Sequence, residues 1–207
     1  MITVDRILDV ERYLDGVDVV LFDLDDTLYS EKQYVCSGFH AVAKSFPEIP
    51  NIADELWNAF CDGKPAIDTV LARYGQTDRK AEALERYRLH EPEIDLYPGV
   101  TEMLDRIGKT KKIGIITDGR PEGQEAKCRA LGLCCKTIIT DALGGAEYRK
   151  PCPEAFERMQ KFFGIPFSRM VYIGDNPNKD FIAPEALGMQ TIWFRNPDGL
   201  YSRTGTN

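Results

Sequence analysis

The stretch VDVVLFDLDDTLYS, residues 17–30, places an apolar run directly before three acids, Asp23, Asp25 and Asp26. The run is bulky and apolar without alternation, which is typical of a parallel strand buried on both faces. Open parallel sheets bind their ligands at the carboxyl ends of the strands. The stretch therefore predicts a strand that delivers carboxylates to a ligand site, although an ordinary acidic turn explains it equally well when it is taken alone.

Three further fragments follow in a fixed order. They are IGIITDGR at 113–120, Arg149-Lys150-Pro151, and VYIGDNPNKDF at 171–181. The first and the last are typical of buried strands that end in polar residues, and Asp180 lies just beyond the last of them. The four motifs together resemble those of the haloacid dehalogenase superfamily, most closely its phosphatase branch. The resemblance covers nearly the whole chain.

Composition limits the kinds of partner. The formal net charge of -7 over 207 residues argues against a protein that binds nucleic acid or a membrane surface. The N-terminal MITVDRILDVERYL has acids among its apolar residues, so it is neither a signal peptide nor a membrane span. Six cysteines without C-x-x-C spacing indicate reduced thiols in a cytoplasmic protein. The expected partner is a small-molecule substrate, while a monomer, a homodimer and a larger assembly all stay open.

Strands and helices alternate through the second half of the chain. Strands are expected at 112–117, 136–140, 170–174 and 190–194, and helices at 99–109, 121–132, 153–163 and 178–187. Such alternation predicts a parallel α/β sheet with right-handed crossovers. The resemblance adds a Rossmann-like core with strand order 5-4-1-2-3. Pro184 falls inside the last helix, where it marks either a first turn or a kink.

Residues 30–97 do not show this alternation, and their pattern predicts helices separated by Pro and Gly. The resemblance implies a helical cap here, with the α/β core formed by 1–29 and 98–207. Lys64 lies between two cap helices, where it either contacts substrate or is ordinary solvated surface. Residues 5–15 predict a short amphipathic helix. Because the chain stops soon after the last strand, we expect that segment or a neighbouring subunit to cover the sheet edge.

The resemblance also implies the chemistry. It makes Asp23 the nucleophile that forms an aspartyl-phosphate, and Asp25 the general acid and base. Mg²⁺ would be held by the carboxylates of Asp23 and Asp175 and by the backbone carbonyl of Asp25, since this cation prefers oxygen ligands. Phosphate esters hydrolyse slowly because their anionic oxygens repel a nucleophile, so neutralisation of charge is the central requirement.

Other positions would serve the phosphoryl group or its surroundings. Thr117, the backbone N–H groups of Asp118 and Gly119, and Lys150 would bind it, with Lys150 also neutralising Asp23. Asp180 and Asn176 would support Lys150 or the water shell of the metal. Arg120, like Lys64, is a candidate for selecting the substrate.

These roles predict a Mg²⁺-dependent phosphatase that hydrolyses a small phosphomonoester such as a sugar phosphate or a nucleotide. Asp25 argues against a dehalogenase, because release of halide needs no acid for the leaving group. A phosphomutase of the same family and a non-catalytic phosphate-binding regulatory domain remain as alternatives. The residues do not select one substrate.

Overall fold

The computed structural model describes residues 1–200, and the chain divides into two compact units. One unit comprises residues 1–31 and the chain from residue 95 onward, and the other comprises Lys32–Ile94. The predicted boundaries at 29–30 and 97–98 lie close to this division. That the second unit acts as a cap stays a prediction.

The first unit is built on a parallel six-stranded sheet with the order β1-β6-β5-β2-β3-β4. The strands are β1 (Ile2–Val4), β2 (Val19–Phe22), β3 (Lys112–Thr117), β4 (Lys136–Ile139), β5 (Met170–Gly174) and β6 (Gln190–Phe194). Counted from β2 as the first, the order is the predicted 5-4-1-2-3, with one strand added at the β6 edge. Every residue of β2 is buried, as expected of the central strand of a sheet that is covered on both faces.

The added strand β1 corrects the prediction for the sheet edge. Ile2 pairs with Ile192 and Val4 with Phe194, so residues 2–4, and not 5–15, extend the sheet beyond β6. A contact of this edge with a neighbouring subunit stays a prediction. Three residues are too few for a periodic pattern, which explains why the sequence did not indicate this strand. Residues 5–15 form a 3₁₀ helix, η1 (Ile7–Tyr13), instead of the predicted amphipathic α-helix.

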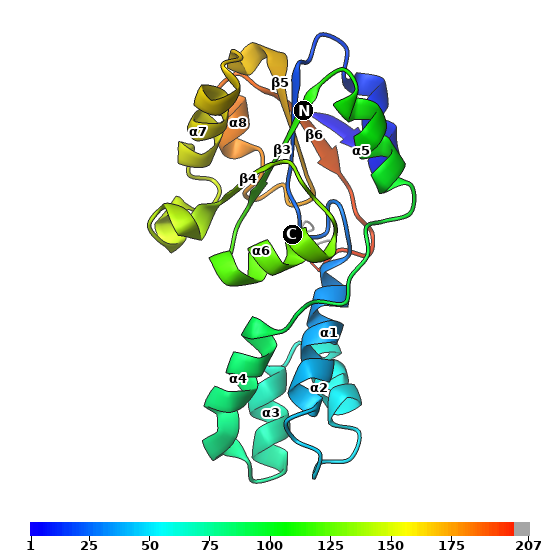
Figure 1. Ribbon diagram of the computed structural model, residues 1–207, viewed down its shortest axis with the longest axis vertical. Coiled ribbons are helices and arrows are strands. Elements are labelled where there is room, and N and C mark those ends of the chain that lie inside the picture. Colours follow the sequence, from blue (N-terminus) through cyan, green and yellow to red (C-terminus); the bar gives the residue numbers. More distant parts are fainter. Residues whose placement is uncertain (201–207) are drawn as a thin grey trace. The chain divides into compact units, whose positions relative to one another are not determined.

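Helices cover both faces of the sheet. They are α5 (Val100–Gly108), α6 (Pro121–Ala130), α7 (Glu154–Phe163) and α8 (Ile182–Ala186), with 3₁₀ turns η3 (Thr140–Leu143), η4 (Ala146–Tyr148) and η5 (Phe167–Arg169). Figure 1 shows α7 and α8 on one side of the sheet and α5 on the other. Helix α8 is shorter than the predicted 178–187, and Pro184 lies in its first turn, where a missing N–H costs nothing.

The second unit is helical, as predicted. It contains α1 (Glu31–Ala43), α2 (Ile52–Cys61), α3 (Ala66–Arg73), η2 (Thr77–Arg79) and α4 (Lys80–Leu89). Its own apolar core includes Phe46, Leu56 and Val70, each fully buried. Within residues 1–200 no helix is both long enough and apolar enough to cross a membrane.

Candidate active site

The carboxyl ends of three neighbouring strands carry the predicted acids. Phe22, the last residue of β2, lies opposite Ile115 of β3 and Ile173 of β5. Asp23 follows at once, and its backbone N–H donates to the Ile173 carbonyl at 2.8 Å. Because the strands run parallel and in register, the residues that follow β3 and β5 emerge at the same edge of the sheet.

Three carboxylates meet at this edge. One oxygen from each of Asp23, Asp175 and Asp180 lies within 4.8 Å of the others. Asp180 is fully buried, and its Oδ2 accepts the backbone N–H of Asn176 at 2.9 Å, which closes the turn after β5. Gly174 makes this approach possible, because a Cβ at that position would lie 2.5 Å from Asp180 Oδ2.

Lys150 lies among these acids with a side chain that is 0% exposed. Its Nζ donates to Asp23 Oδ1 at 2.5 Å and to the Tyr172 hydroxyl at 2.8 Å, and it pairs with Asp180 Oδ1 at 2.8 Å. Burial alone would lower the pKa of Lys150, but the charges of Asp180 and Asp23 outweigh it and hold that pKa well above its usual value. The predicted contact between Lys150 and the acids therefore exists in the structure.

The cluster nevertheless has three carboxyl groups against the single ammonium group of Lys150. Burial raises the pKa of Asp23 to about 7, although Lys150 opposes the change. Burial and the negative charges of Asp23 and Asp180 raise the pKa of Asp175 to about 9. In the part of the chain that the structure describes, the Asp175 carboxylate forms neither a hydrogen bond nor an ion pair with a side chain. Like charges held this closely favour protonation, or a cation that takes the place of the proton.

A hard divalent cation fits this donor set. The three side chains offer only carboxylate oxygens, which are the ligands that Mg²⁺ prefers, and no soft sulfur or imidazole ligand is among them. Within residues 1–200 the Asp175 carboxylate has no side-chain partner outside the cluster, whereas Asp180 is already paired with Lys150. The predicted contribution of the Asp25 backbone carbonyl stays a prediction.

Asp25 lies in a network of its own. Its Oδ1 accepts from Lys127 Nζ at 2.7 Å, its Oδ2 from Gln124 Nε2 at 3.2 Å, and it also accepts the Tyr29 hydroxyl. Burial would raise the pKa of Asp25, but Lys127 and these donors together hold it below its ordinary value. The sequence analysis missed Lys127 and Gln124, whose only signal was their i, i+3 spacing on one face of the predicted helix 121–132.

Thr117 and Gly119 flank the turn after β3. Thr117 is fully buried, and its hydroxyl donates to Gln124 Oε1 at 3.0 Å instead of pointing at open space. Gly119 has φ 132°, and a Cβ there would lie 2.8 Å from Gln124 Nε2, so this turn requires glycine. The predicted contacts of Thr117 and Gly119 with a phosphoryl group stay predictions.

Asp118 fixes the loops around the site. Its Oδ1 accepts the Thr140 hydroxyl at 3.0 Å and the backbone N–H of Lys150 at 3.1 Å. Its Oδ2 accepts from Lys179 Nζ at 3.0 Å. Burial would raise the pKa of Asp118, but Lys150 and Lys179 hold it below its usual value. Lys179 is a third residue that the sequence analysis missed, since it lies between the motif positions Asp175 and Asp180.

The acids and cations surround a cavity of about 270 Å³. Its lining consists of charged side chains: Asp23, Asp25, Asp26, Glu31, Asp118, Arg149, Lys150, Asp175 and Lys179. Arg149 is held in place by two hydrogen bonds of 2.6 Å to the carboxylate of Asp141. The cavity thus offers both carboxylates and cations, and the cations can receive an anionic group.

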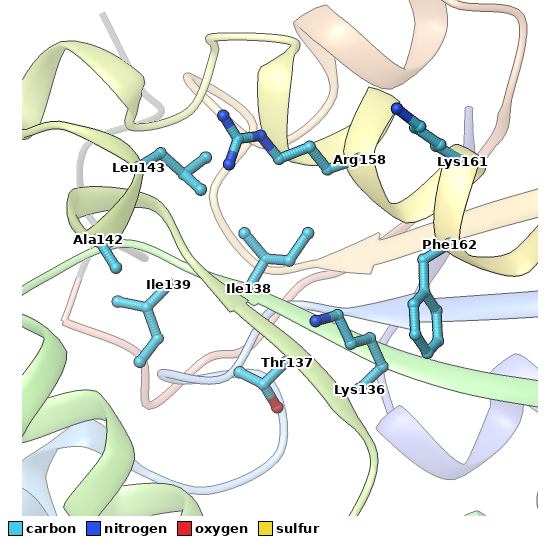
Figure 2. Close-up of a pocket in the computed structure, with 9 residues that line it drawn as sticks. All are labelled: Lys136, Thr137, Ile138, Ile139, Ala142, Leu143, Arg158, Lys161 and Phe162. Atoms are coloured by element: carbon cyan, nitrogen blue, oxygen red, sulfur yellow. The ribbon is translucent and has the colours of Figure 1, made fainter.

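A larger cavity of about 390 Å³ lies beside the edge strand β4 (Figure 2). Apolar side chains such as Ile138, Leu143 and Phe162 form much of its wall, with Arg158 and Lys161 projecting from α7. No carboxylate is among the described residues that line it. Chemistry, rather than size, therefore points to the cavity at the ends of β2, β3 and β5.

Arg120 and Asn176 are not among the described residues that line that cavity, and Lys64 is part of the other unit. Arg120 is exposed. Lys64 belongs to the helical unit, where it pairs with Asp62 at 2.9 Å. Asn176 is buried, and its Oδ1 accepts the backbone N–H of Asn178 at 3.1 Å, so it shapes the turn that carries Asp175 and Asp180.

Comparison with known families agrees with the fold and with this geometry. The model of the family described as haloacid dehalogenase-like hydrolase matches residues 17–188, a span that contains all four motifs. The chain therefore belongs to the haloacid dehalogenase-like hydrolases, as the motifs predicted.

Individual relatives of this chain indicate the branch of the family. The glyceraldehyde 3-phosphate phosphatase of Methanocaldococcus jannaschii is 30% identical over 190 residues, which cover 84% of this chain and 82% of the relative. The pyrimidine 5'-nucleotidase YjjG of Escherichia coli is 26% identical over 208 residues, covering 88% and 90%. A haloacid dehalogenase-superfamily hydrolase structure from Geobacter sulfurreducens has a TM-score of 0.67 at 16% identity, covers 88% and 89%, and shares the fold. These findings confirm the predicted assignment to the phosphatase branch and to the phosphoric monoester hydrolases.

Proposed function

We propose that this protein is a Mg²⁺-dependent phosphatase that hydrolyses a small phosphomonoester, with Asp23 as the nucleophile. The observation that carries the proposal is the position of Asp23, which is held by Lys150 at 2.5 Å and lies in one cluster with Asp175. Lys150 favours the ionised, nucleophilic form of Asp23 in a site where burial alone would protonate it.

The reaction proceeds in two displacements. A carboxylate oxygen of Asp23 attacks phosphorus, the bond to the ester oxygen breaks, and that oxygen takes a proton from Asp25. A water molecule then gives its proton to Asp25 and attacks the aspartyl-phosphate, which releases phosphate and restores Asp23. Mg²⁺, held by Asp23 and Asp175, would neutralise charge on the phosphoryl oxygens.

Asp25 has to change its protonation during this cycle. With Lys127 at 2.7 Å its ionised form is favoured before substrate binds, which suits its role as the acceptor of the proton from water. An anionic phosphoryl group placed near Asp25 raises the pKa of this carboxyl group, because like charges disfavour ionisation. Binding of substrate thus prepares Asp25 to act as the acid.

The substrate is proposed to be small. The cavity of about 270 Å³ has room for a phosphoryl group with a short organic part. Relatives named glyceraldehyde 3-phosphate phosphatase and pyrimidine 5'-nucleotidase support a sugar phosphate or a nucleotide. A cytoplasmic location is part of the proposal, supported by six cysteines that are all free thiols.

The test is phosphate release from p-nitrophenyl phosphate and from a panel of sugar phosphates and nucleotides, with Mg²⁺ and with EDTA. We expect turnover that requires Mg²⁺ and is abolished in Asp23→Asn. The control is Asp105→Asn, which removes an exposed carboxylate on α5 and is expected to keep full activity.

Other outcomes separate the alternatives. Transfer of the phosphoryl group to a second sugar in place of water would identify a phosphomutase. A folded protein that binds phosphate without turning over any member of the panel would contradict the proposal and favour a binding domain.

A further inference from the structure

Two ammonium groups, those of Lys150 and Lys179, line the cavity at the ends of β2, β3 and β5. They come from different loops, since Lys150 follows η4 and Lys179 lies in the turn after β5. A phosphoryl group bound at Asp23 gains hydrogen bonds most readily from a lysine whose N–H donors are not already used inside the protein. The contacts that Lys150 and Lys179 make within the fold therefore show which of the two has such donors.

The ammonium group of Lys150 is already engaged inside the protein. Of its three N–H donors, two make hydrogen bonds, to Asp23 Oδ1 at 2.5 Å and to Tyr172 Oη at 2.8 Å. Its charge also pairs with Asp180 Oδ1 at 2.8 Å, although that oxygen accepts no hydrogen bond within residues 1–200. The side chain is 0% exposed, so an incoming phosphoryl group has to compete with these buried partners for Lys150.

Lys179 is in the opposite situation. Its ammonium group makes one hydrogen bond within residues 1–200, to Asp118 Oδ2 at 3.0 Å, which leaves two N–H donors. Its side chain is 30% exposed, compared with none of that of Lys150. Because Lys179 also lines the cavity, these two donors can reach a bound anion without breaking a contact inside the protein.

The position of Lys179 is fixed from both ends. Its backbone N–H donates to the Asn176 carbonyl at 3.2 Å, within the turn that also carries Asp175 and Asp180. Its partner Asp118 is itself held by the Thr140 hydroxyl and by the backbone N–H of Lys150. A cation that is already held in place loses little conformational entropy when an anion binds, which favours tight binding.

We propose that Lys179 is a substrate-binding residue that donates hydrogen bonds to the phosphoryl group, in addition to Lys150, which holds Asp23 and Asp180. The inference rests on the proposed function, since it concerns the same site. It adds a second lysine to the binding of the phosphoryl group, for which the sequence analysis named only Lys150.

The test measures binding of inorganic phosphate by calorimetry, in Mg²⁺ and again in EDTA, because this readout does not depend on turnover. We expect Lys179→Met to bind phosphate roughly 10- to 100-fold more weakly than the wild-type protein, the factor that corresponds to a charged hydrogen bond. Lys179→Arg should retain most of the affinity, since it keeps the charge and the donors. The control, Lys109→Met, removes an exposed lysine at the end of α5 and should bind as the wild-type protein does.

The phosphate affinities of these variants test the role of Lys179 once each variant is shown to be folded. Circular dichroism melts establish that Lys179→Met is folded, and Lys179→Arg provides a second test if it is not. Unchanged phosphate affinity in folded Lys179→Met, or an equal loss in Lys109→Met, would overturn the inference. Absence of phosphate binding by the wild-type protein would overturn it as well. Turnover of p-nitrophenyl phosphate that depends on Asp23, combined with unchanged phosphate binding in Lys179→Met, would leave the proposed phosphatase intact and refute only the role of Lys179.

Discussion

Replacement of Asp175 by Asn should stabilise the metal-free protein while abolishing its activity. In an unfolded chain this carboxyl group ionises near pH 3.8, whereas burial and the charges of Asp23 and Asp180 raise its pKa to about 9 in the folded protein. Between these values the folded chain keeps a proton that the unfolded chain has released. Stability contributed by Asp175 is therefore lost as the pH rises, because the unfolded state gains from ionisation and the folded state does not.

The effect on the free energy of unfolding follows from the difference between the pKa values of Asp175 in the unfolded and the folded chain. One pKa unit corresponds to about 1.4 kcal/mol, so the cost to the folded state at pH 7 is about 4 kcal/mol, against about 2 kcal/mol at pH 5. Asn carries no charge at any pH and avoids this cost. Since the surroundings relax in part, we expect a gain of roughly 2–4 kcal/mol at pH 7, or about 4–16 °C in Tm for a chain of this size.

The assay is thermal unfolding at pH 5, 7 and 8 in EDTA, repeated with Mg²⁺. Mg²⁺ at ten times its Kd should stabilise the wild-type protein by about 1.4 kcal/mol and should leave Asp175→Asn unchanged. Asp141→Asn is the matched control with the opposite sign. Hydrogen bonds from Arg149 hold the pKa of Asp141 below its usual value, so this variant should be less stable than the wild-type protein at neutral pH, with the difference shrinking as the pH falls.

Two outcomes would refute this reasoning. Asp175→Asn could prove less stable than the wild-type protein at pH 8 in EDTA, which would mean that its carboxylate makes a favourable contact in the fold. Its stability gain could also fail to grow between pH 5 and pH 8, which would mean that Asp175 is ionised at its ordinary pKa.

Two further substitutions test the surroundings of the site. Lys127→Met leaves the carboxylate of Asp25 without its cation, so the free energy of unfolding in urea should fall by about 3–5 kcal/mol, whereas an unchanged value would show that the pair is not buried in solution. Gly174→Ala places a Cβ 2.5 Å from Asp180 Oδ2, so it should cost about 1–3 kcal/mol and lower the turnover of p-nitrophenyl phosphate. Gly108→Ala, whose Cβ would have an ordinary contact at 3.7 Å, is its control and should lower neither property.

The sequence predicted the positions of the strands well, since four of them were indicated within a residue of their observed bounds by apolar runs that end in turn residues. Burial on both faces leaves a strong local signal of this kind. The three-residue strand β1 and the five-residue helix α8 are too short to show a periodic apolar pattern, so the sequence did not predict β1 or the bounds of α8. The strand order came from the resemblance, because no local pattern encodes which strands are neighbours.

At the candidate active site, too, the sequence predicted some features and the tertiary structure decided others. The sequence by itself determined which residue types follow each strand, and hence that Asp23, Asp118 and Asp175 would gather at one edge of a parallel sheet. Only the tertiary structure decided their partners. Lys127 meets Asp25 across 102 positions of the chain, and Lys150 meets Asp23 across 127. Such pairs depend on how helices and loops from distant segments pack. The arrangement that buries Lys150 among Asp23, Tyr172 and Asp180 and leaves Lys179 with two donors unused within residues 1–200 is therefore a property of the folded molecule.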